Sequence, residues 1–172
     1  MTASITKLGI PAAVVTSALV LLAPMLAFAA NPHFVGTPTI NKTISGNTAT
    51  LTVNGKVAGL GNEPVTLQLT TSGVTVQTAC ENKGGHNPPG QTATFGPTSG
   101  QTQTIQPRNG QISFKNAAPL TVTITAAQAG CPDGMKPLIT SATFSNVQLT
   151  LYQGTGTTGT ILLQYNFGTV DP

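Results

Sequence analysis

Apolar residues recur at every second position along most of this chain from Asn31 onward, and not at the spacing of three or four that a helix would need. The clearest runs are Ala49–Val53, Val65–Leu69, Val74–Cys80, Leu120–Ala126, Val147–Leu151 and Ile161–Phe167. Threonine and glutamine fill most of the intervening positions. This alternation predicts half-buried strands, with about seven to nine of them in the chain.

Turn-forming pairs separate these runs. Asn54-Gly55 and Asn109-Gly110 are favoured two-residue hairpin signals, and Ser72-Gly73 predicts another reversal of the chain. The apolar residues change parity between Phe144 and Val147, which predicts a bulge or a break near Asn146. Short alternating runs with frequent turn signals and no helical period predict an all-β antiparallel sandwich over residues 31–172 as a single domain.

A short resemblance supports this fold class. Val53–Val57 (VNGKV) followed by Asn62–Leu67 (NEPVTL) resembles the opening hairpin of bacterial immunoglobulin-like and carboxypeptidase-regulatory-like extracellular modules. The resemblance implies an immunoglobulin-like β-sandwich. Because such modules mostly act as stalks, adhesins or spacers, it implies no catalytic residues.

The first thirty residues have the pattern of a secretory signal peptide. Lys7 precedes an apolar run from Leu8 to Phe28, and Ala27-Phe28-Ala29 predicts cleavage after Ala29 or Ala30. The run is also about long enough for a retained membrane anchor, so that alternative stays open. We expect a secreted or cell-surface protein that does not associate with the membrane after cleavage.

The two cysteines, Cys80 and Cys131, are expected to form a disulfide, because an even pair is usually oxidised outside the cytoplasm. Cys80 shares the inward parity of its strand, whereas Cys131 lies beyond the alternation. The bridge is therefore expected to join a strand end to a loop. Between them lies a predicted long Gly/Pro-rich loop at 81–104.

Charge is scarce in this chain. Only 6% of its residues are charged, compared with about 25% in ordinary soluble domains. The basic residues after the leader are scattered singly along the sequence, at Lys42, Lys56, Lys83, Arg108, Lys115 and Lys136. A nucleic-acid-binding groove needs a basic stripe, so we expect no nucleic-acid partner.

Candidate chemistry is limited to the region of the cysteines. Glu81 and Asp133 are the two carboxylates that the bridge would bring together, and His86 lies in the intervening loop. A hydrolase using His86 is a remote alternative, because no Gly-x-Ser-x-Gly elbow accompanies it. No metal site or cofactor is predicted, since the acids do not follow the spacing of a calcium loop or a zinc site.

Aromatic platforms for carbohydrate are also sparse. The chain has no tryptophan, and most of its Phe and Tyr residues occupy core parity, which leaves Phe95 and Tyr152 as candidate exposed rings. Asn41-Lys42-Thr43 matches the glycosylation pattern and makes Asn41 a candidate acceptor.

These observations lead to two expectations for function. The first is a non-catalytic structural or adhesive extracellular module that associates with itself or with a cell-surface or matrix component through strand edges, for which residues 31–44 are the candidate segment. Few charges are available to protect such edges. The alternative is a ligand-binding or glycan-binding module whose surface, near Cys80 and Cys131, includes Glu81, His86, Phe95 and Asp133.

Overall fold

A computed structural model of the protein describes residues 31–171, and the predicted signal peptide at 1–30 lies outside this range. The elements are β1 (His33–Phe34), β2 (Thr39–Ser45), β3 (Thr48–Ala58), β4 (Val65–Thr71), β5 (Gly73–Glu81), β6 (Ala93–Phe95), β7 (Thr98–Ser99), β8 (Gln103–Ile105), β9 (Ile112–Thr123), α1 (Ala126–Ala129), β10 (Lys136–Gln153) and β11 (Ile161–Val170). The described chain is almost entirely β-structure, as predicted.

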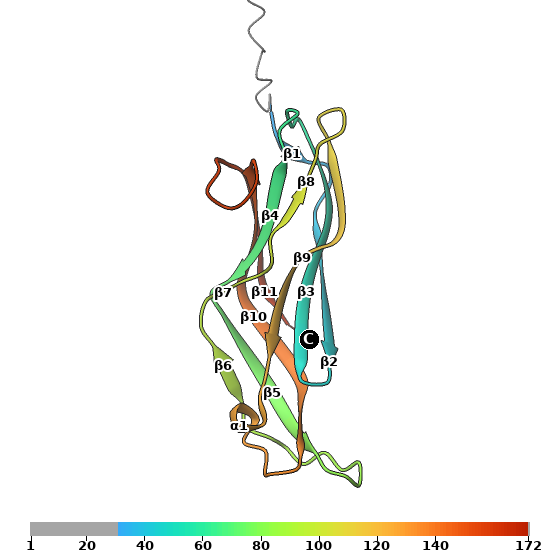
Figure 1. The fold of residues 1–172 in the computed structure, drawn as a ribbon, viewed down its shortest axis with the longest axis vertical. Helices are drawn as coiled ribbons and strands as arrows, with labels where there is room; N and C mark the ends of the chain where they lie inside the picture. The colour runs from blue at the N-terminus through green and yellow to red at the C-terminus, as the bar shows by residue number, and fades with distance from the viewer. Residues whose placement is uncertain (1–30, 172) are drawn as a thin grey trace, which may run out of the picture.

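The strands form two antiparallel sheets that run along the long axis of the molecule (Figure 1). In the first sheet β3 lies in the middle, with β9 along one side and β1 and β2 one after the other along its opposite side. In the second sheet β10 has β11 on one side and the β4–β5 line on the other, and β6, β7 and β8 follow the outer side of that line. The first sheet thus has three lines of strands, and the second has four.

The core lies between the two sheets and is made by the apolar positions of the alternating runs. Leu51 and Leu120 are register partners in the first sheet and are fully buried. Leu69 and Leu149 are paired and fully buried in the second. On the outer face of the first sheet, Thr48 bonds to Thr123 at 3.2 Å and Thr50 to Thr121 at 3.1 Å between hydroxyl oxygens. Cross-strand threonine pairs of this kind stabilise a sheet without using charge.

One of the two Asn-Gly pairs forms the expected turn. Asn109 and Gly110 have φ values of 51° and 70°, as a two-residue hairpin of the favoured handedness requires. Arg108 and Gln111 on either side exchange backbone hydrogen bonds of 2.9 and 3.1 Å. This turn was predicted correctly from the sequence.

The prediction of a hairpin at Asn54-Gly55 is wrong, because β3 continues straight through both residues to Ala58. Gly55 is required there for another reason. A Cβ at this position would lie 2.7 Å from the Phe114 ring, so the glycine lets that ring pack against the strand.

Ser72-Gly73 does not reverse the chain either. β4 and β5 both pair with β10 in one continuous direction, with Leu69 opposite Leu149 and Val74 opposite Phe144. The pair therefore marks a local break in one long line of strands. In β10 the predicted irregularity near Asn146 is confirmed as a bulge: Asn146 has a φ of 49°, and the β10–β11 register shifts between Phe144 and Val147.

Two further expectations need correction. The segment predicted as a loop at 81–104 contains the end of β5, all of β6 and β7 and the start of β8, so its longest stretch outside the strands is 82–92. The run Leu120–Ala126 was expected to remain extended, but β9 ends at Thr123 and α1 forms one helical turn. A four-residue helix is too short to produce a detectable helical period.

Candidate functional site

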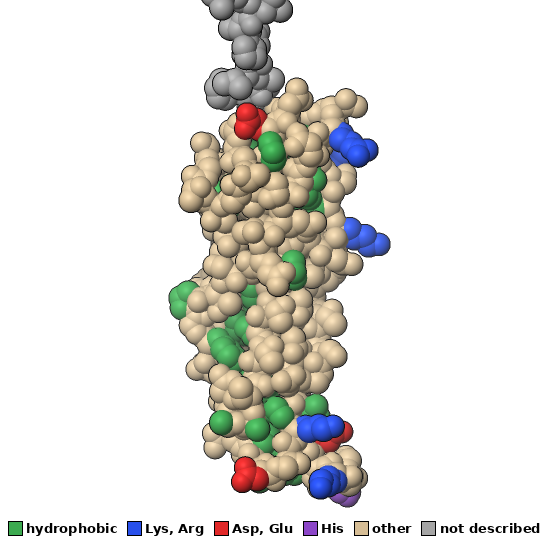
Figure 2. Space-filling view, in the orientation of Figure 1, with side chains coloured by type: hydrophobic (Ala, Val, Ile, Leu, Met, Phe, Trp, Pro, Cys, Tyr) green, Lys and Arg blue, Asp and Glu red, His purple; other side chains and the backbone are tan. Residues whose placement is uncertain are grey.

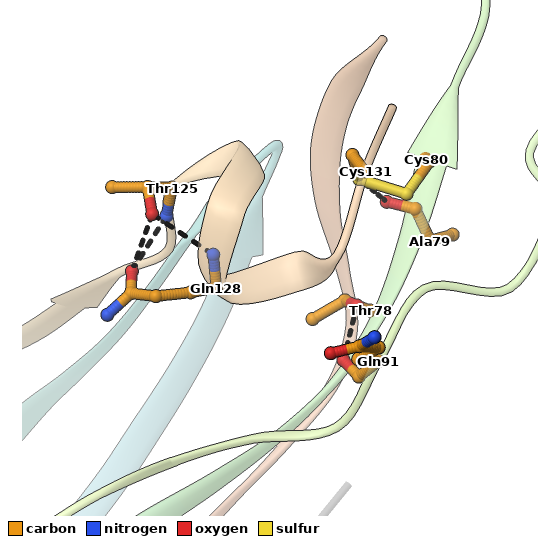
Figure 3. The surroundings of a disulfide bond; sticks show 7 residues. All are labelled: Thr78, Ala79, Cys80, Gln91, Thr125, Gln128 and Cys131. Carbon is orange, nitrogen blue, oxygen red and sulfur yellow. Dashed lines mark hydrogen bonds between the residues drawn. A yellow bond between two sulfur atoms is a disulfide. The ribbon is translucent and has the colours of Figure 1, made fainter. Parts of the chain in front are cut away.

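A disulfide between Cys80 and Cys131 closes one end of the sandwich, which we call the bridged end (Figure 3). Their Cα atoms lie 5.5 Å apart. Cys80 is the penultimate residue of β5 and is buried, while Cys131 follows α1 in the connection from β9 to β10. The expectation of a bridge from a strand end to a loop is confirmed, and it does not cross the core between the sheets.

The short helix α1 positions Cys131. Thr125 caps the helix by accepting from the Gln128 N–H at 3.2 Å, while the Gln128 side-chain oxygen accepts from the Thr125 N–H at 2.9 Å (Figure 3). Gly130 ends the helix with a φ of 64°, and the N–H of Cys131 then bonds to the Ala126 carbonyl at 2.9 Å. These caps at both ends hold the cysteine against the end of β5.

Two loops meet around a pocket at the bridged end. Its volume is about 280 Å³, and its lining comprises Glu81, Asn82, Lys83, Gly85, Gly134 and Lys136. The first loop is organised by Asn82, whose side-chain oxygen accepts from the N–H groups of Gly84 and His86 at 2.8 and 3.0 Å. One carboxylate and two ammonium groups thus line a small polar hollow that suits a polar ligand.

The predicted site residues divide into two groups. Glu81 lines the pocket, and His86 and Asp133 are exposed in the two loops that form it. Phe95 is not part of this surface. It pairs with Val74, six residues along β5 from Cys80, which corresponds to about 20 Å of strand. Phe95 is half-buried and packs against the core, because β6 belongs to the second sheet.

Four of the six scattered basic residues come together in two pairs. Lys83 and Lys136 line the bridged-end pocket, and Lys56 and Arg108 line a second pocket of about 370 Å³ at the other end. Figure 2 shows the same distribution on one face, with charged side chains toward the two ends and few between them. Neither pair could be predicted from the sequence, because each depends on strand register. The Asn109-Gly110 turn signal indicates only that Arg108 lies at the end of a hairpin.

Lys42 and Lys115 belong to neither pair, and of these two Lys42 points inward. It shares the inward parity of Ile40 and Ile44 on β2, is half-buried, and donates from Nζ to the Ala142 carbonyl of β10 at 2.9 Å. Burial lowers the pKa of the Lys42 ammonium below its usual value of 10.5, and the negative charge of Asp171 acts in the opposite direction. An inward-pointing lysine protects an edge strand, so the expectation that this edge is unprotected is wrong.

The remaining candidate sites lie on the surface. Asn41 is exposed on β2, and its side chain makes only a long contact of 3.4 Å with Asn116. Tyr152 is half-buried at the end of β10. Within residues 31–171, no group of three or more His, Cys, Asp and Glu side chains is placed to hold a metal ion, and no helix of that range is long and apolar enough to cross a membrane.

Comparison with known proteins identifies no family. No family model matches the sequence, and no curated protein matches it. Among solved structures, the chain is similar to a Bacteroides uniformis β-glucuronidase at 22% identity and a TM-score of 0.35, covering 79% of this chain and 14% of that one. A calcium-binding mutant of β-glucuronidase 2 from the same organism gives the same values. The chain thus spans about one-seventh of the length of these enzymes.

Proposed function

We propose that this protein is a secreted, non-catalytic module with an immunoglobulin-like β-sandwich that has a structural or adhesive role and associates through a strand edge. Three features support export and fold. The leader pattern at 1–30 and the disulfide are typical of exported chains. In chain order, the first, second and fifth lines of strands form one sheet and the other four form the second. Compared with an antibody constant domain, only the fourth line has changed sheets.

The observation that carries the adhesive role is the outer edge of β11. This ten-residue strand contains no charged side chain and pairs only with β10 among the described strands. Its central residues Leu163–Asn166 face Leu151–Gln148 in unbroken register, so its other side offers a regular row of backbone groups. A partner strand can add to such an edge by backbone hydrogen bonding.

A partly covered apolar strip accompanies this edge. Leu163, Tyr165 and Phe167 are half-buried, although Leu151 and Leu149, the β10 partners of the first two, belong to the core. Phe34 from β1 meets Tyr165 edge to face, with ring centroids 5.7 Å apart, and Tyr165 meets Phe167 at 4.9 Å. An added strand would cover these rings further, which adds hydrophobic stabilisation to the backbone pairing.

The β2 edge is the weaker candidate, which changes the expectation for residues 31–44. Lys42 would be buried still further if a strand were added beside β2, and burying an ammonium group without a matched partner is costly. We therefore assign association to β11.

Light scattering of the mature protein over a range of concentrations, with negative-stain microscopy, tests this proposal. Gln164→Lys together with Thr169→Lys adds two charges to exposed positions of β11 and should abolish association. The matched control is Thr39→Lys with Thr43→Lys on exposed positions of β2, which should leave association unchanged. A wild-type protein that stays monomeric at high concentration and forms no fibres contradicts the edge proposal.

The bridged-end pocket favours a second candidate, a ligand-binding or glycan-binding surface. The two loops that were expected to form this surface both contribute to the lining of the pocket, one through Lys83 and the other through Gly134. Because β6, β7 and β8 all lie between residues 93 and 105, a loop exchange has to be confined to 83–87. Replacing those residues with a Gly/Ser stretch should remove binding on a glycan array and leave thermal stability nearly unchanged. Retained binding contradicts this candidate.

A further inference from the structure

The end of the sandwich opposite the disulfide, which we call the hairpin end, contains a pocket with two positive charges. Lys56 and Arg108 line it together with Ile105, Gln106, Gln111, Ile112 and Ser113, around a volume of about 370 Å³. This volume is within the usual range for small-ligand pockets. The lining comes from β3, β8, β9 and the turn between β8 and β9.

Backbone contacts fix the positions of both cations. Lys56 faces Ser113 across the β3–β9 ladder. Arg108 and Gln111 exchange backbone hydrogen bonds across the Asn109-Gly110 turn, and the N–H of Leu60 donates to the Gly110 carbonyl at 2.9 Å. The turn is therefore attached to the body of the domain, which reduces the conformational entropy lost when a ligand binds.

The two cations lack a carboxylate partner in this pocket. Among the described residues none of the lining side chains is acidic, whereas Glu81 accompanies the two lysines at the bridged end. Glu63 is exposed and lies beside Asn62, whose carbonyl accepts from the Gln106 side chain, but it does not line the pocket. Two uncompensated cations in one hollow attract an oxyanion, and a guanidinium can bind one with two hydrogen bonds.

We propose that the hairpin-end pocket binds the carboxylate or sulfate group of an acidic polysaccharide. Lys56 and Arg108 bind the anionic group, and Gln106, Gln111 and Ser113 offer hydrogen bonds to sugar hydroxyl groups. Ile105 supplies an apolar wall for the C–H face of a sugar ring. The residues that line the pocket include no aromatic side chain on which a base could stack, which disfavours a single-stranded nucleic acid.

This proposal rests on export of the protein but not on association through β11. Titration of the labelled mature domain with polygalacturonate, dextran sulfate and neutral dextran, followed by amide NMR shifts, tests it. The carboxylate or the sulfate polymer should shift the amides of residues 105–113 and of Lys56, and neutral dextran should not. Which polymer binds more tightly identifies the oxyanion.

Lys56→Ala with Arg108→Ala should weaken binding at least tenfold, since each cation contributes a charge-assisted hydrogen bond. Lys83→Ala with Lys136→Ala removes the same charge at the bridged end and should leave the affinity within about twofold of wild type. Glu63→Gln removes a nearby negative charge and should raise the affinity modestly. Unchanged amide spectra away from the substitutions show that each variant is folded.

The proposal is overturned if neither anionic polymer shifts these amides or if both double variants weaken binding equally. Equal affinity for a single-stranded oligonucleotide would also overturn it, because that result indicates unspecific polyelectrolyte binding.

Discussion

The two ends of this sandwich each hold a pocket with two cations, yet they are built in different ways. At the bridged end a disulfide and a capped helical turn hold loops that include a carboxylate, Glu81. At the hairpin end the backbone hydrogen bonds of an Asn-Gly turn position Arg108, and no acidic side chain of the described residues lines the pocket. The disulfide thus supports a pocket in which a carboxylate offsets one of the two positive charges, whereas the turn supports a pocket in which neither charge is offset.

Because of this difference, the two pockets are expected to select their ligands in different ways. A pocket whose positive charges are partly offset attracts anions more weakly, so shape and hydrogen bonds contribute more to the choice of its ligand. A pocket whose charges are not offset selects by charge first. Between the ends, the surface carries mainly hydroxyl and amide groups. Ions in solution screen charges that lie far apart, so the charges of one end have little effect on ligand binding at the other.

Removing the disulfide is expected to have the largest effect. Cys80→Ala with Cys131→Ala should lower the free energy of unfolding by about 4 kcal/mol, because the bridge closes a loop of about fifty residues in the unfolded chain. Urea denaturation monitored by circular dichroism measures this loss. Hydrogen exchange of the folded variant should increase in residues 82–90 and 126–135 while the hairpin end keeps its protection. Equal loosening at both ends would contradict independent anchoring.

Gly110→Ala tests how much the Asn109-Gly110 turn stabilises the hairpin end, again by urea denaturation. Gly110 has a φ of 70°, and a Cβ there would lie 2.8 Å from the Leu60 carbonyl oxygen. We expect a loss of about 2 to 3 kcal/mol, from a left-handed backbone combined with a steric clash. Gly134→Ala at the bridged end is the matched control. It also has a positive φ, of 83°, but nothing lies within 4 Å of its Cβ position, so it should cost about 1 kcal/mol.

Gly55→Ala should have a smaller effect that distinguishes the two Asn-Gly pairs. Its new Cβ would press against the Phe114 ring, at a cost of about 1 to 2 kcal/mol. Phe114→Leu in the same chain should recover part of this loss by making room, and a double-mutant cycle measures the coupling. If the losses in free energy of unfolding of the two substitutions are additive, Gly55 is not required to make room for the Phe114 ring.

The two Asn-Gly pairs show how far the sequence predicts the fold. Both have the same local preference, but Asn109-Gly110 lies where two strands end, whereas Asn54-Gly55 lies within a strand whose partner β9 continues past it. Tertiary pairing overrides the turn preference at the second pair. The alternating runs, the disulfide and the bulge at Asn146 could be predicted because each depends on local pattern or on composition.

The candidate sites were harder to predict for a related reason. Glu81, His86 and Asp133 could be placed near one another because a covalent bond joins their neighbours in the chain. Lys56 and Arg108 are brought together by the β3–β9 register, which shifts twice along its length, and by the turn that leads into β9. A one-residue error in register moves a side chain to the opposite face, so such a pair cannot be read from spacing alone.

The smallest expected effect is the pH dependence of stability caused by Lys42, which lies between the two ends of the molecule. Burial holds the pKa of its ammonium below 10.5 in the folded protein, so between pH 7 and 10.5 the unfolded chain binds the proton more tightly. The free energy of unfolding should therefore rise as the pH increases through the folded pKa toward 10.5. Lys42→Met should remove this rise, and Lys115→Met on the exposed face of β9 should keep it. Urea denaturation between pH 7 and 10.5 measures both variants. An equal slope in wild type and Lys42→Met would mean that the ammonium is fully hydrated, and the β2 edge would then be as open to pairing as β11.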